Sequence, residues 1–422
     1  MKSVRSRETV WVLAVLIGLC WSVSGEDERA AQAQSAIKGD CDPALLTGNA
    51  QKKCENERNH EGRRLFDAEQ FAGNGRTCVT CHSKQTGTIS PEDVQARLAE
   101  DQSDPLFLGD GLDDGVQGTS RITTHATIRI ELQLPPWVKL ANDPTARSIV
   151  VNRGVPTTVD TPSFVKAGQP GLNKLLVDGR APNLQQQALG AIHDHTENTV
   201  EPTALELDLI AEFQQNDGRF FSSEAVRAFA KGGAAPTLPE GNTDSERRGR
   251  LMFLDTPFTP GSKVGICALC HSGPMLNQAN QFSLPVFGTP PGVRFFDIGV
   301  SKRNIPTNPV MDFIVTNDDG TTVAFSSPDP GMVLTNPRIA NPATPKSFGI
   351  DFFRTPILRG IAKTAPYFHD NSAKTLRDAV HHYVRFFNFP CDVDPVGSCT
   401  VGGLIELTEE DVDDITAFLK LL

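Results

Sequence analysis

Apolar residues recur at helical spacing in four short stretches of the chain, and these stretches form two similar pairs. The first pair consists of residues 62–66 and 208–213, and the second of residues 249–253 and 413–418. Apolar side chains three and four positions apart predict an amphipathic helix with one buried face. The chain is therefore predicted to contain two similar halves, each of which opens and closes on a helix.

The last of these helices has a well-marked start. Thr408 is followed by acidic residues, and a hydroxyl at this position caps the N–H groups of a first turn that favours negative charge. The apolar stripe that follows consists of Val412, Ile415, Leu419 and Leu422. This stripe predicts a helix that begins next to Thr408.

Loop-like stretches divide the chain further. Residues 232–242 are rich in Gly and Pro, and we place the boundary between the halves near residue 235. Within the first half, residues 84–150 are expected to form an inserted subdomain. They contain a predicted helix after Pro91 and a run, residues 123–134, whose composition favours a β-strand.

Residues 1–25 have the three-part pattern of a secretory signal, with basic residues, an apolar run and then small residues. The apolar run is short for a membrane span of about 20 residues, although an uncleaved membrane anchor is the alternative. We expect a cleaved signal, and no later segment is long enough to cross a membrane. The formal net charge of the chain is −11, and an acidic surface disfavours nucleic acid and anionic membranes as partners.

The sequence Cys-x-x-Cys-His occurs twice, as Cys78-Val-Thr-Cys81-His82 and as Cys267-Ala-Leu-Cys270-His271. Two thiols at this spacing bond to the vinyl groups of haem, and the His that follows binds the iron. The two copies therefore predict two covalently attached c-type haems. Haem c is attached outside the cytoplasm, which in a bacterium means the periplasm. A zinc ribbon, which spaces its Cys pairs by roughly 15–20 residues, and a dithiol redox pair, which needs no His, are the alternatives.

In each half a helix, a haem motif, a long loop and a closing helix follow one another, which is the layout of a cytochrome c domain. The predicted fold is mainly α, with cytochrome c-like domains at residues 26–235 and 236–422. Each domain holds one covalent haem, and the insertion at about residues 84–150 belongs to the first. Outside the motifs, the close pairs Cys41/Cys54 and Cys391/Cys399 are predicted to form local disulfides, with free thiols as the alternative.

Several further stretches of both halves match a single known family. They are residues 62–66, Val155-Pro-Thr157, Asp178-Gly-Arg-Ala181 with Leu184 and Gln187-Ala188, Cys270-His-Ser-Gly-Pro274, Phe296-Asp-Ile-Gly299, Thr355-Pro-Ile-Leu-Arg359 and Thr364-Ala-Pro-Tyr-Phe-His-Asp370. Together they resemble the bacterial di-haem cytochrome c peroxidases and the related MauG-type enzymes over roughly residues 55–420. The last stretch is specific to this family and is not general to cytochromes c.

The resemblance implies that the two haems have different roles. The N-terminal haem meets hydrogen peroxide, and the C-terminal haem is six-coordinate and stores or relays an electron. In the family its second axial ligand lies 14 residues after the position of His369, which gives Tyr383. Peroxidases usually place Met there and MauG-type enzymes Tyr, whose oxygen favours ferric iron. His381 and His382 are the competing ligands.

The resemblance also implies an acid on the peroxide side of the first haem, which moves a proton between the two peroxide oxygens. The family spacing falls on Glu197, with Gln187 as a nearby polar residue. His193 and His195 are alternative partners of the first haem. A sixth ligand from His193, His195 or His125 would instead give a purely electron-transferring cytochrome.

Family members bind a calcium ion between the haems, and two of its ligands are backbone carbonyls at positions that match Thr364 and Pro366. The family's Asn ligand falls on Gly154, with Asn152 nearby, so this part of the calcium site departs from the family. Arg180 is expected to support a haem propionate or the interface between the halves.

A second departure concerns the contact between the haems. Family members commonly carry a Trp before Asp-Gly-Arg, where this chain has Val177. Trp137, in the inserted stretch, is the one Trp that remains after removal of residues 1–25. Either Trp137 folds back to replace the missing ring, or the haems are coupled by another route.

The combined expectation is a periplasmic di-haem oxidoreductase that uses hydrogen peroxide. Its electrons come from a small soluble cytochrome or copper protein or, in the MauG-type variant, from an aromatic side chain of a protein substrate. Tyr383 favours the second source and Val177 disfavours it. A non-catalytic di-haem electron-transfer cytochrome is the alternative, and a haem dioxygenase acting on an organic substrate has no direct support in the sequence.

Overall fold

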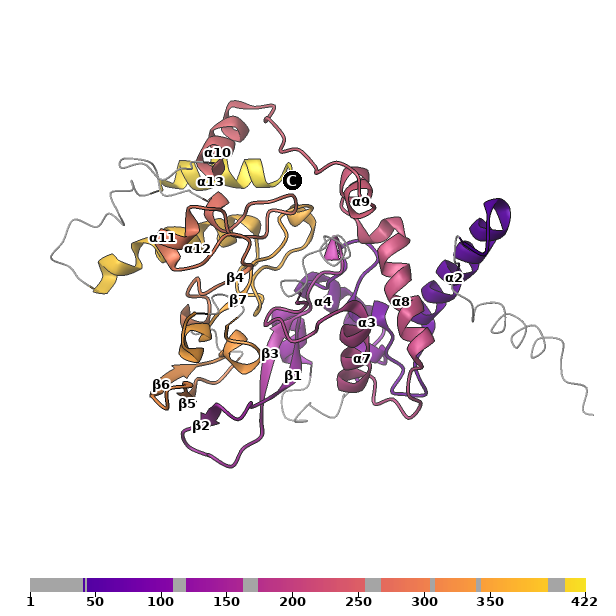
Figure 1. The fold of residues 1–422 in the computed structure, drawn as a ribbon, viewed down its shortest axis with the longest axis horizontal. Helices are drawn as coiled ribbons and strands as arrows, with labels where there is room; N and C mark the ends of the chain where they lie inside the picture. The colour runs from indigo at the N-terminus through magenta and orange to yellow at the C-terminus, as the bar shows by residue number, and fades with distance from the viewer. Residues whose placement is uncertain are drawn as a thin grey trace, which may run out of the picture. The chain divides into compact units, whose positions relative to one another are not determined.

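A computed structural model describes residues 41, 44–108, 119–161, 174–254, 267–303, 308–338, 343–393 and 407–422. The chain divides into two compact units, residues 1–57 and residues 58–422. Nearly all of both predicted halves lies in the second unit, and Figure 1 labels its elements. The predicted signal, residues 1–25, lies outside the described residues.

Regular structure in the described residues is mainly helical, as the sequence predicted. The α-helices are α2 Gly48–Ala68, α3 Cys78–Cys81, α4 Pro91–Glu100, α5 Ser120–His125, α7 Leu184–His195, α8 Ala204–Asn216, α9 Glu224–Ala230, α10 Asp244–Leu254, α11 Ser283–Phe287, α12 Leu376–Val393 and α13 Glu409–Leu419. The 3-10 helices are η1 Pro105–Phe107, η2 Gly218–Phe220, η3 Cys267–Leu269, η4 Ser301–Arg303, η5 Met332–Leu334, η6 Lys346–Gly349 and η7 Ile361–Lys363.

Short antiparallel strands form three small sheets in the described residues. They are β1 Thr127–Gln133 with β3 Ser148–Gly154, β2 Val138–Leu140 with β5 Met311–Thr316 and β6 Thr322–Ser327, and β4 Phe295–Phe296 with β7 Phe353–Arg354. Strand β1 confirms the strand predicted within residues 123–134. Helix α4 confirms the helix predicted after Pro91, and its first turn is capped because the Asp93 N–H donates to Ser90 Oγ at 3.2 Å.

The inserted stretch is not confined to the first half. Strand β2 pairs with β5, which belongs to the second half, and Val138 lies opposite Val315. Apolar side chains from both halves, including Ile130, Val151 and Phe313, pack into one buried cluster beside this sheet. The β5–β6 hairpin was not predicted from the sequence, which indicated an inserted stretch in the first half.

Each half is built on the same close crossing of two helices. A Cβ atom at Gly62 of α2 would lie 2.3 Å from the carbonyl oxygen of Leu209 in α8, and one at Gly249 of α10 would lie 2.0 Å from that of Asp414 in α13. Only glycine permits so close an approach. Figure 1 shows α10 crossing α13. A Phe pair packs at each crossing, Phe66 with Phe213 and Phe253 with Phe418.

Two local predictions are confirmed. Cys41 and Cys54 form a disulfide, with their Cα atoms 5.8 Å apart. Thr408 caps α13, because its hydroxyl accepts a hydrogen bond from the Asp411 N–H at 3.3 Å. Cys399 and the side chain of Cys391 lie outside the described residues, so this second disulfide stays a prediction.

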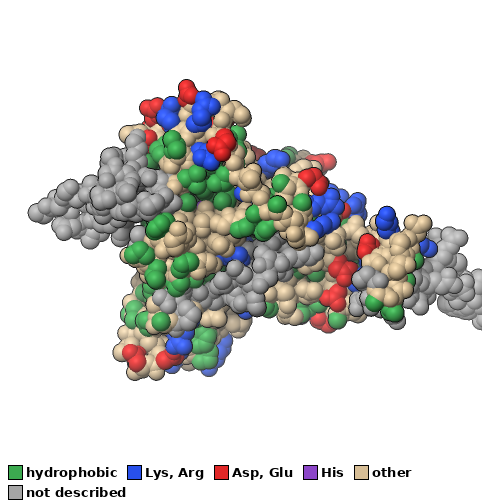
Figure 2. All heavy atoms as spheres, turned by 45° about the horizontal axis from the view of Figure 1, so that its top comes forward, with side chains coloured by type: hydrophobic (Ala, Val, Ile, Leu, Met, Phe, Trp, Pro, Cys, Tyr) green, Lys and Arg blue, Asp and Glu red, His purple; other side chains and the backbone are tan. Residues whose placement is uncertain are grey.

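Side chains of both charges are interspersed on the face of the molecule that Figure 2 shows. Exposed charged side chains form ion pairs between neighbouring helices, such as Arg377 of α12 with Asp413 of α13 at 2.7 Å. Among the described residues, no helix combines the length and the hydropathy that a membrane span requires.

Candidate haem sites

The two Cys-x-x-Cys-His motifs hold their histidines in the same way. Cys78–Cys81 form α3, and His82 follows directly. Cys267–Leu269 form η3, and Cys270 and His271 follow. His82 Nδ1 lies 2.8 Å from the carbonyl oxygen of Gly87, and His271 Nδ1 lies 2.9 Å from that of Leu276, five residues ahead in both cases. Because a carbonyl only accepts, Nδ1 carries the proton in each ring and Nε2 keeps its lone pair. Such a bond orients a metal-binding His and strengthens it as a ligand.

Burial keeps both rings neutral. It lowers the pKa of His82, and it lowers the pKa of His271 to about 4, although the hydrogen bonds to Gly87 and Leu276 act in the opposite direction. A neutral imidazole is the form that binds iron. Burial thus favours, in both histidines, the protonation state that a haem iron requires.

The motif cysteines are also arranged for haem attachment. None of the four is in a disulfide, and burial raises the pKa values of the Cys78 and Cys267 thiols to about 12. A dithiol redox pair depends on a lowered thiol pKa, so that alternative is disfavoured. In the described part of the chain, no three His, Cys, Asp or Glu side chains gather as a metal cluster.

A mainly apolar cavity of about 260 Å³ adjoins the second motif. Its wall includes His271 together with both motif thiols, Cys267 and Cys270. One face of α12 closes it, with Ala379, Val380, Tyr383 and Phe386 at helical spacing. A cavity that presents two thiols and a neutral His among apolar side chains fits a covalently attached haem.

Tyr383 lies in the wall of this cavity, as its predicted role requires. Burial raises the pKa of its phenol, and the nearby Cys270 and Cys267 raise it further. His381 Nε2 instead lies 3.1 Å from Glu409 Oε1 on the surface, and His382 Nε2 donates to the Ile298 carbonyl at 2.7 Å. Of the three candidates Tyr383 is thus the one that faces the second site, and its role as iron ligand stays a prediction.

The chain that leads into the first motif is packed against a polar loop that follows α7. The Asn74 N–H donates to the Thr196 carbonyl at 2.7 Å, and the Val200 N–H donates to the Phe71 carbonyl at 3.1 Å. Arg76 Nη1 donates to the His195 carbonyl at 3.3 Å. These contacts place residues 195–200 beside the chain that leads into Cys78.

The predicted residues of this loop have different surroundings. Glu197 is exposed and has a left-handed backbone, with φ of +49°, and Gln187 is half-buried on α7. His193 is exposed and lies 2.8 Å from Glu201, whereas His195 is close enough to His82 to lower its pKa. The loop therefore brings His195, and not His193, toward the first site.

No family model matches the chain. A curated relative, hydrazine synthase subunit gamma of Kuenenia stuttgartiensis, is 26% identical over 186 residues, which is 43% of this chain. The match spans 41% of that relative, which is less than half of its length.

Solved structures resemble the chain at low sequence identity. A MauG-like protein associated with microbial copper homeostasis is 17% identical, with 86% of this chain and 88% of that chain covered and a TM-score of 0.42. The diheme peroxidase BthA from Burkholderia thailandensis is 19% identical, with 86% and 84% covered and a TM-score of 0.44. Kuenenia stuttgartiensis hydrazine synthase is 15% identical, with 99% and 100% covered and a TM-score of 0.39. The first two are of the protein class that the motifs resemble.

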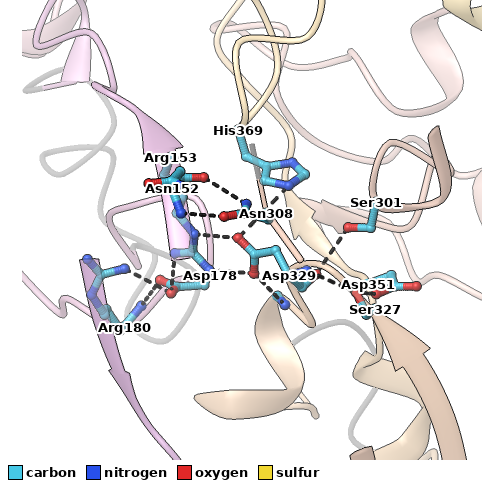
Figure 3. A network of polar contacts seen from close by, with 11 residues as sticks. Asn152, Arg153, Asp178, Arg180, Ser301, Asn308, Ser327, Asp329, Asp351 and His369 are labelled. Atoms are coloured by element: carbon cyan, nitrogen blue, oxygen red, sulfur yellow. Dashed lines mark hydrogen bonds and ion pairs between the residues drawn. The ribbon is translucent and has the colours of Figure 1, made fainter. Parts of the chain in front are cut away.

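A buried ion-pair network joins the two halves (Figure 3). Arg153 of β3 makes two hydrogen bonds to Asp329, at 2.6 and 2.8 Å, and one to Asp178 at 2.6 Å. Burial alone would raise the pKa of Asp178, but Arg153 and Arg180 lower it to about 2. Arg180 donates to Asp178 at 2.8 Å within the first half, and its role at a haem propionate or at the interface stays a prediction.

The residues predicted around calcium are only partly arranged as expected. Thr364 and Pro366 line the cavity, as does Gly154. A Cβ at Gly154 would lie 2.0 Å from Asn371 Oδ1, so the Asn371 carboxamide fills the space of a side chain at position 154. Asn152 is held through its backbone by hydrogen bonds with Asn308. Asn371 was not predicted from the sequence, because no local pattern singles it out. The calcium ion stays a prediction.

Trp137 does not replace the missing aromatic ring. Val177 lines the cavity, but the Trp137 side chain packs beside the β2–β5–β6 sheet, where its Nε1–H donates to the Val333 carbonyl at 2.8 Å. Phe353 and His369 also line the cavity, and their rings stack with centroids 3.7 Å apart. Of the two routes left open by the sequence, the one through Trp137 is thus wrong.

Proposed function

We propose that the protein is a periplasmic di-haem c oxidoreductase of the cytochrome c peroxidase/MauG type that uses hydrogen peroxide. The observation that supports this most is the matched pair of histidines, His82 and His271, which share one geometry but have unequal surroundings. His271 adjoins an apolar cavity that Tyr383 closes. The chain that leads into the first motif packs on the polar loop that carries Glu197. Two equivalent electron-transfer sites would not need this asymmetry.

The residues of the two sites have different roles. Bound haem supplies an iron that exchanges single electrons. His82 and His271 would hold the iron through Nε2, and the four motif cysteines would fix the haem groups covalently. Tyr383 Oη closes the second site to small molecules. At the first site, the Glu197 carboxylate takes a proton from one peroxide oxygen and returns it to the other.

The electron donor is a small redox protein or an aromatic side chain of a protein substrate. Tyr383 supports the second source, because an oxygen ligand stabilises oxidised iron. Val177 supports the first, because no aromatic ring stands at that position. A purely electron-transferring cytochrome is the second candidate function, and the position of His195 near His82 favours it.

The ferric spectrum of the holoprotein separates the two functions. Our proposal expects one high-spin and one low-spin haem in electron paramagnetic resonance, without the absorption band of a methionine–iron bond. Added hydrogen peroxide is expected to change the high-spin signal first. Two low-spin haems that do not react with peroxide would rule out the enzyme and leave the electron-transfer cytochrome.

Replacing Tyr383 with Phe is expected to convert the low-spin ferric signal to high-spin and to raise the reduction potential of the second haem. The chain offers a matched control, because Tyr367 is its only other Tyr and also lines the cavity. The Tyr367 hydroxyl donates to the Ile361 carbonyl at 3.0 Å. Tyr367→Phe is therefore expected to keep the low-spin signal. An unchanged spectrum in Tyr383→Phe would show that another group binds the iron.

Replacing Glu197 with Gln is expected to slow peroxide reduction by about 100-fold, because positioned acid–base groups contribute on this scale. Haem content and the ferric spectrum are expected to stay the same. Glu201→Gln is the control, since Glu201 lies on the same loop but is paired with His193 on the surface. Stopped-flow absorbance with hydrogen peroxide measures the rates. Equal rates in both variants would remove Glu197 from the mechanism.

A further inference from the structure

The loop that follows His82 packs directly on a segment of the cavity wall at the second site. Residues 83–88 form this loop, and residues 154–161 form the segment. Thr88 Oγ1 donates to the Val155 carbonyl at 2.6 Å, and Thr157 Oγ1 donates to the Thr86 carbonyl at 2.7 Å. The segment lines the cavity through Gly154, Val155, Pro156, Thr157, Val159 and Thr161.

At the centre of this contact, the Gly87 carbonyl accepts two hydrogen bonds. His82 Nδ1–H donates to it at 2.8 Å, and the backbone N–H of Thr158 donates to it at 3.1 Å. Gly87 has a φ of +65°, and a Cβ there would lie 2.8 Å from the Thr158 nitrogen. The position therefore requires glycine for its backbone conformation and for the close approach. Two hydrogen bonds thus connect the ring of His82 with the peptide unit of residues 157 and 158.

We propose that this peptide unit couples the two haem sites, an inference that rests on the proposed function for the presence of both haems. Thr158 acts as a positioning residue. Its N–H and the Nδ1–H of His82 both donate to the Gly87 carbonyl. The Thr158 N–H therefore weakens the hydrogen bond between that carbonyl and His82. The strength of this bond sets the strength of His82 as a ligand.

The same hydrogen-bonded path leads from His82 to the cavity wall. It does not depend on an aromatic ring between the sites, since position 177 is Val and Trp137 packs elsewhere. Electron exchange along this path moves one electron from one iron to the other. No atom or proton is transferred, so the exchange needs no further reactant. Coupling through backbone hydrogen bonds is independent of the identity of any aromatic side chain between the sites.

Thr158→Pro tests the proposal, because proline has no N–H to donate. If the proline variant does not fold, the α-hydroxy acid analogue of threonine at position 158 replaces the N–H with an oxygen and keeps the side chain. Two controls keep the path intact. Thr158→Ala keeps the amide, and Thr88→Val removes a hydrogen bond between the same two segments without touching Gly87.

Without the Thr158 N–H, the Gly87 carbonyl accepts more strongly from His82, so the reduction potential of the first haem is expected to fall and that of the second to stay unchanged. Electron redistribution between the haems, followed after photolysis of the carbon monoxide adduct of the half-reduced protein, is expected to slow by about 10-fold. Both controls are expected to match the wild-type protein. A merely structural contact would instead make Thr88→Val behave like Thr158→Pro.

The proposal is overturned if the Thr158→Pro or hydroxy-acid variant, with both haems attached, keeps the wild-type potential and exchange rate. It is also overturned if Thr88→Val shows the same changes. Neither measurement uses peroxide. A wild-type protein that fails to react with peroxide therefore refutes the proposed function alone, because the potentials and the exchange rate are still compared between the same variants.

Discussion

Replacing Cys78 and Cys81 together with Ser is expected to lower covalently bound haem from two per chain to one. Ser has no thiol to form the bonds that hold haem c, and the second motif is left unchanged. The variant is also expected to lose the high-spin ferric signal and the reaction with peroxide, because our proposal assigns both to the first site. The pyridine haemochrome spectrum per mole of protein measures the haem content.

The matched control removes two cysteines elsewhere. Cys41→Ser with Cys54→Ser opens the disulfide that precedes the motif and is expected to keep both haems. The complementary variant, Cys267→Ser with Cys270→Ser, is expected to lose the low-spin signal instead. If both motif variants lost the same spectral signal, the assignment of unequal roles to the two sites would be wrong.

Replacing Arg153 with Met is expected to lower the free energy of unfolding by about 3–5 kcal/mol, because it leaves buried carboxylates without their cation. Arg153 is 1% exposed and both of its partners, Asp178 and Asp329, are fully buried. Arg180→Met is the control, because Arg180 binds the same Asp178 but is partly exposed. Its loss is expected to cost about 1 kcal/mol or less. Urea unfolding of the holoprotein measures both.

The pH dependence provides a second test of this network. The pKa of Asp178 is about 2 in the folded protein, below its usual value of 3.8. A depressed pKa contributes stability that is present above the usual pKa and is lost as the pH falls through the folded value. In Arg153→Met the carboxyls that lose their cation take up protons more easily, so the cost of the substitution is expected to shrink near about pH 4. An equal cost at about pH 7 and about pH 4 would show that the ion pair is not its source.

Several parts of the structure follow from short stretches of sequence. The helix pairs were predicted from residue spacing, the cap at Thr408 and helix α4 from the residues that start them, and strand β1 from composition. The disulfide of Cys41 with Cys54 was predicted from closeness in sequence and composition. These features succeeded because helix periodicity, capping and short loop closure depend on residues that are near one another in the chain.

The family resemblance added residues that no local pattern singles out. It selected Tyr383 over the adjacent His382, and the structure places Tyr383 at the cavity while His382 donates to the Ile298 carbonyl. The roles of Tyr383 and Glu197 still depend on that resemblance. The inserted stretch, which the sequence assigned to the first half, also contacts the second half, since β2 of the first pairs with β5 of the second.

The sequence by itself determined that two haem motifs exist, that each has its own His and that each half opens and closes on a helix. Only the tertiary structure decided which carbonyls hold the two rings, that Asn371 fills the space beside Gly154, and that Trp137 lies away from the cavity. It also decided that Arg153 meets Asp329, 176 residues away. The physical reason is that spacing along a chain fixes which face a residue occupies, whereas packing between distant segments fixes which atoms it meets.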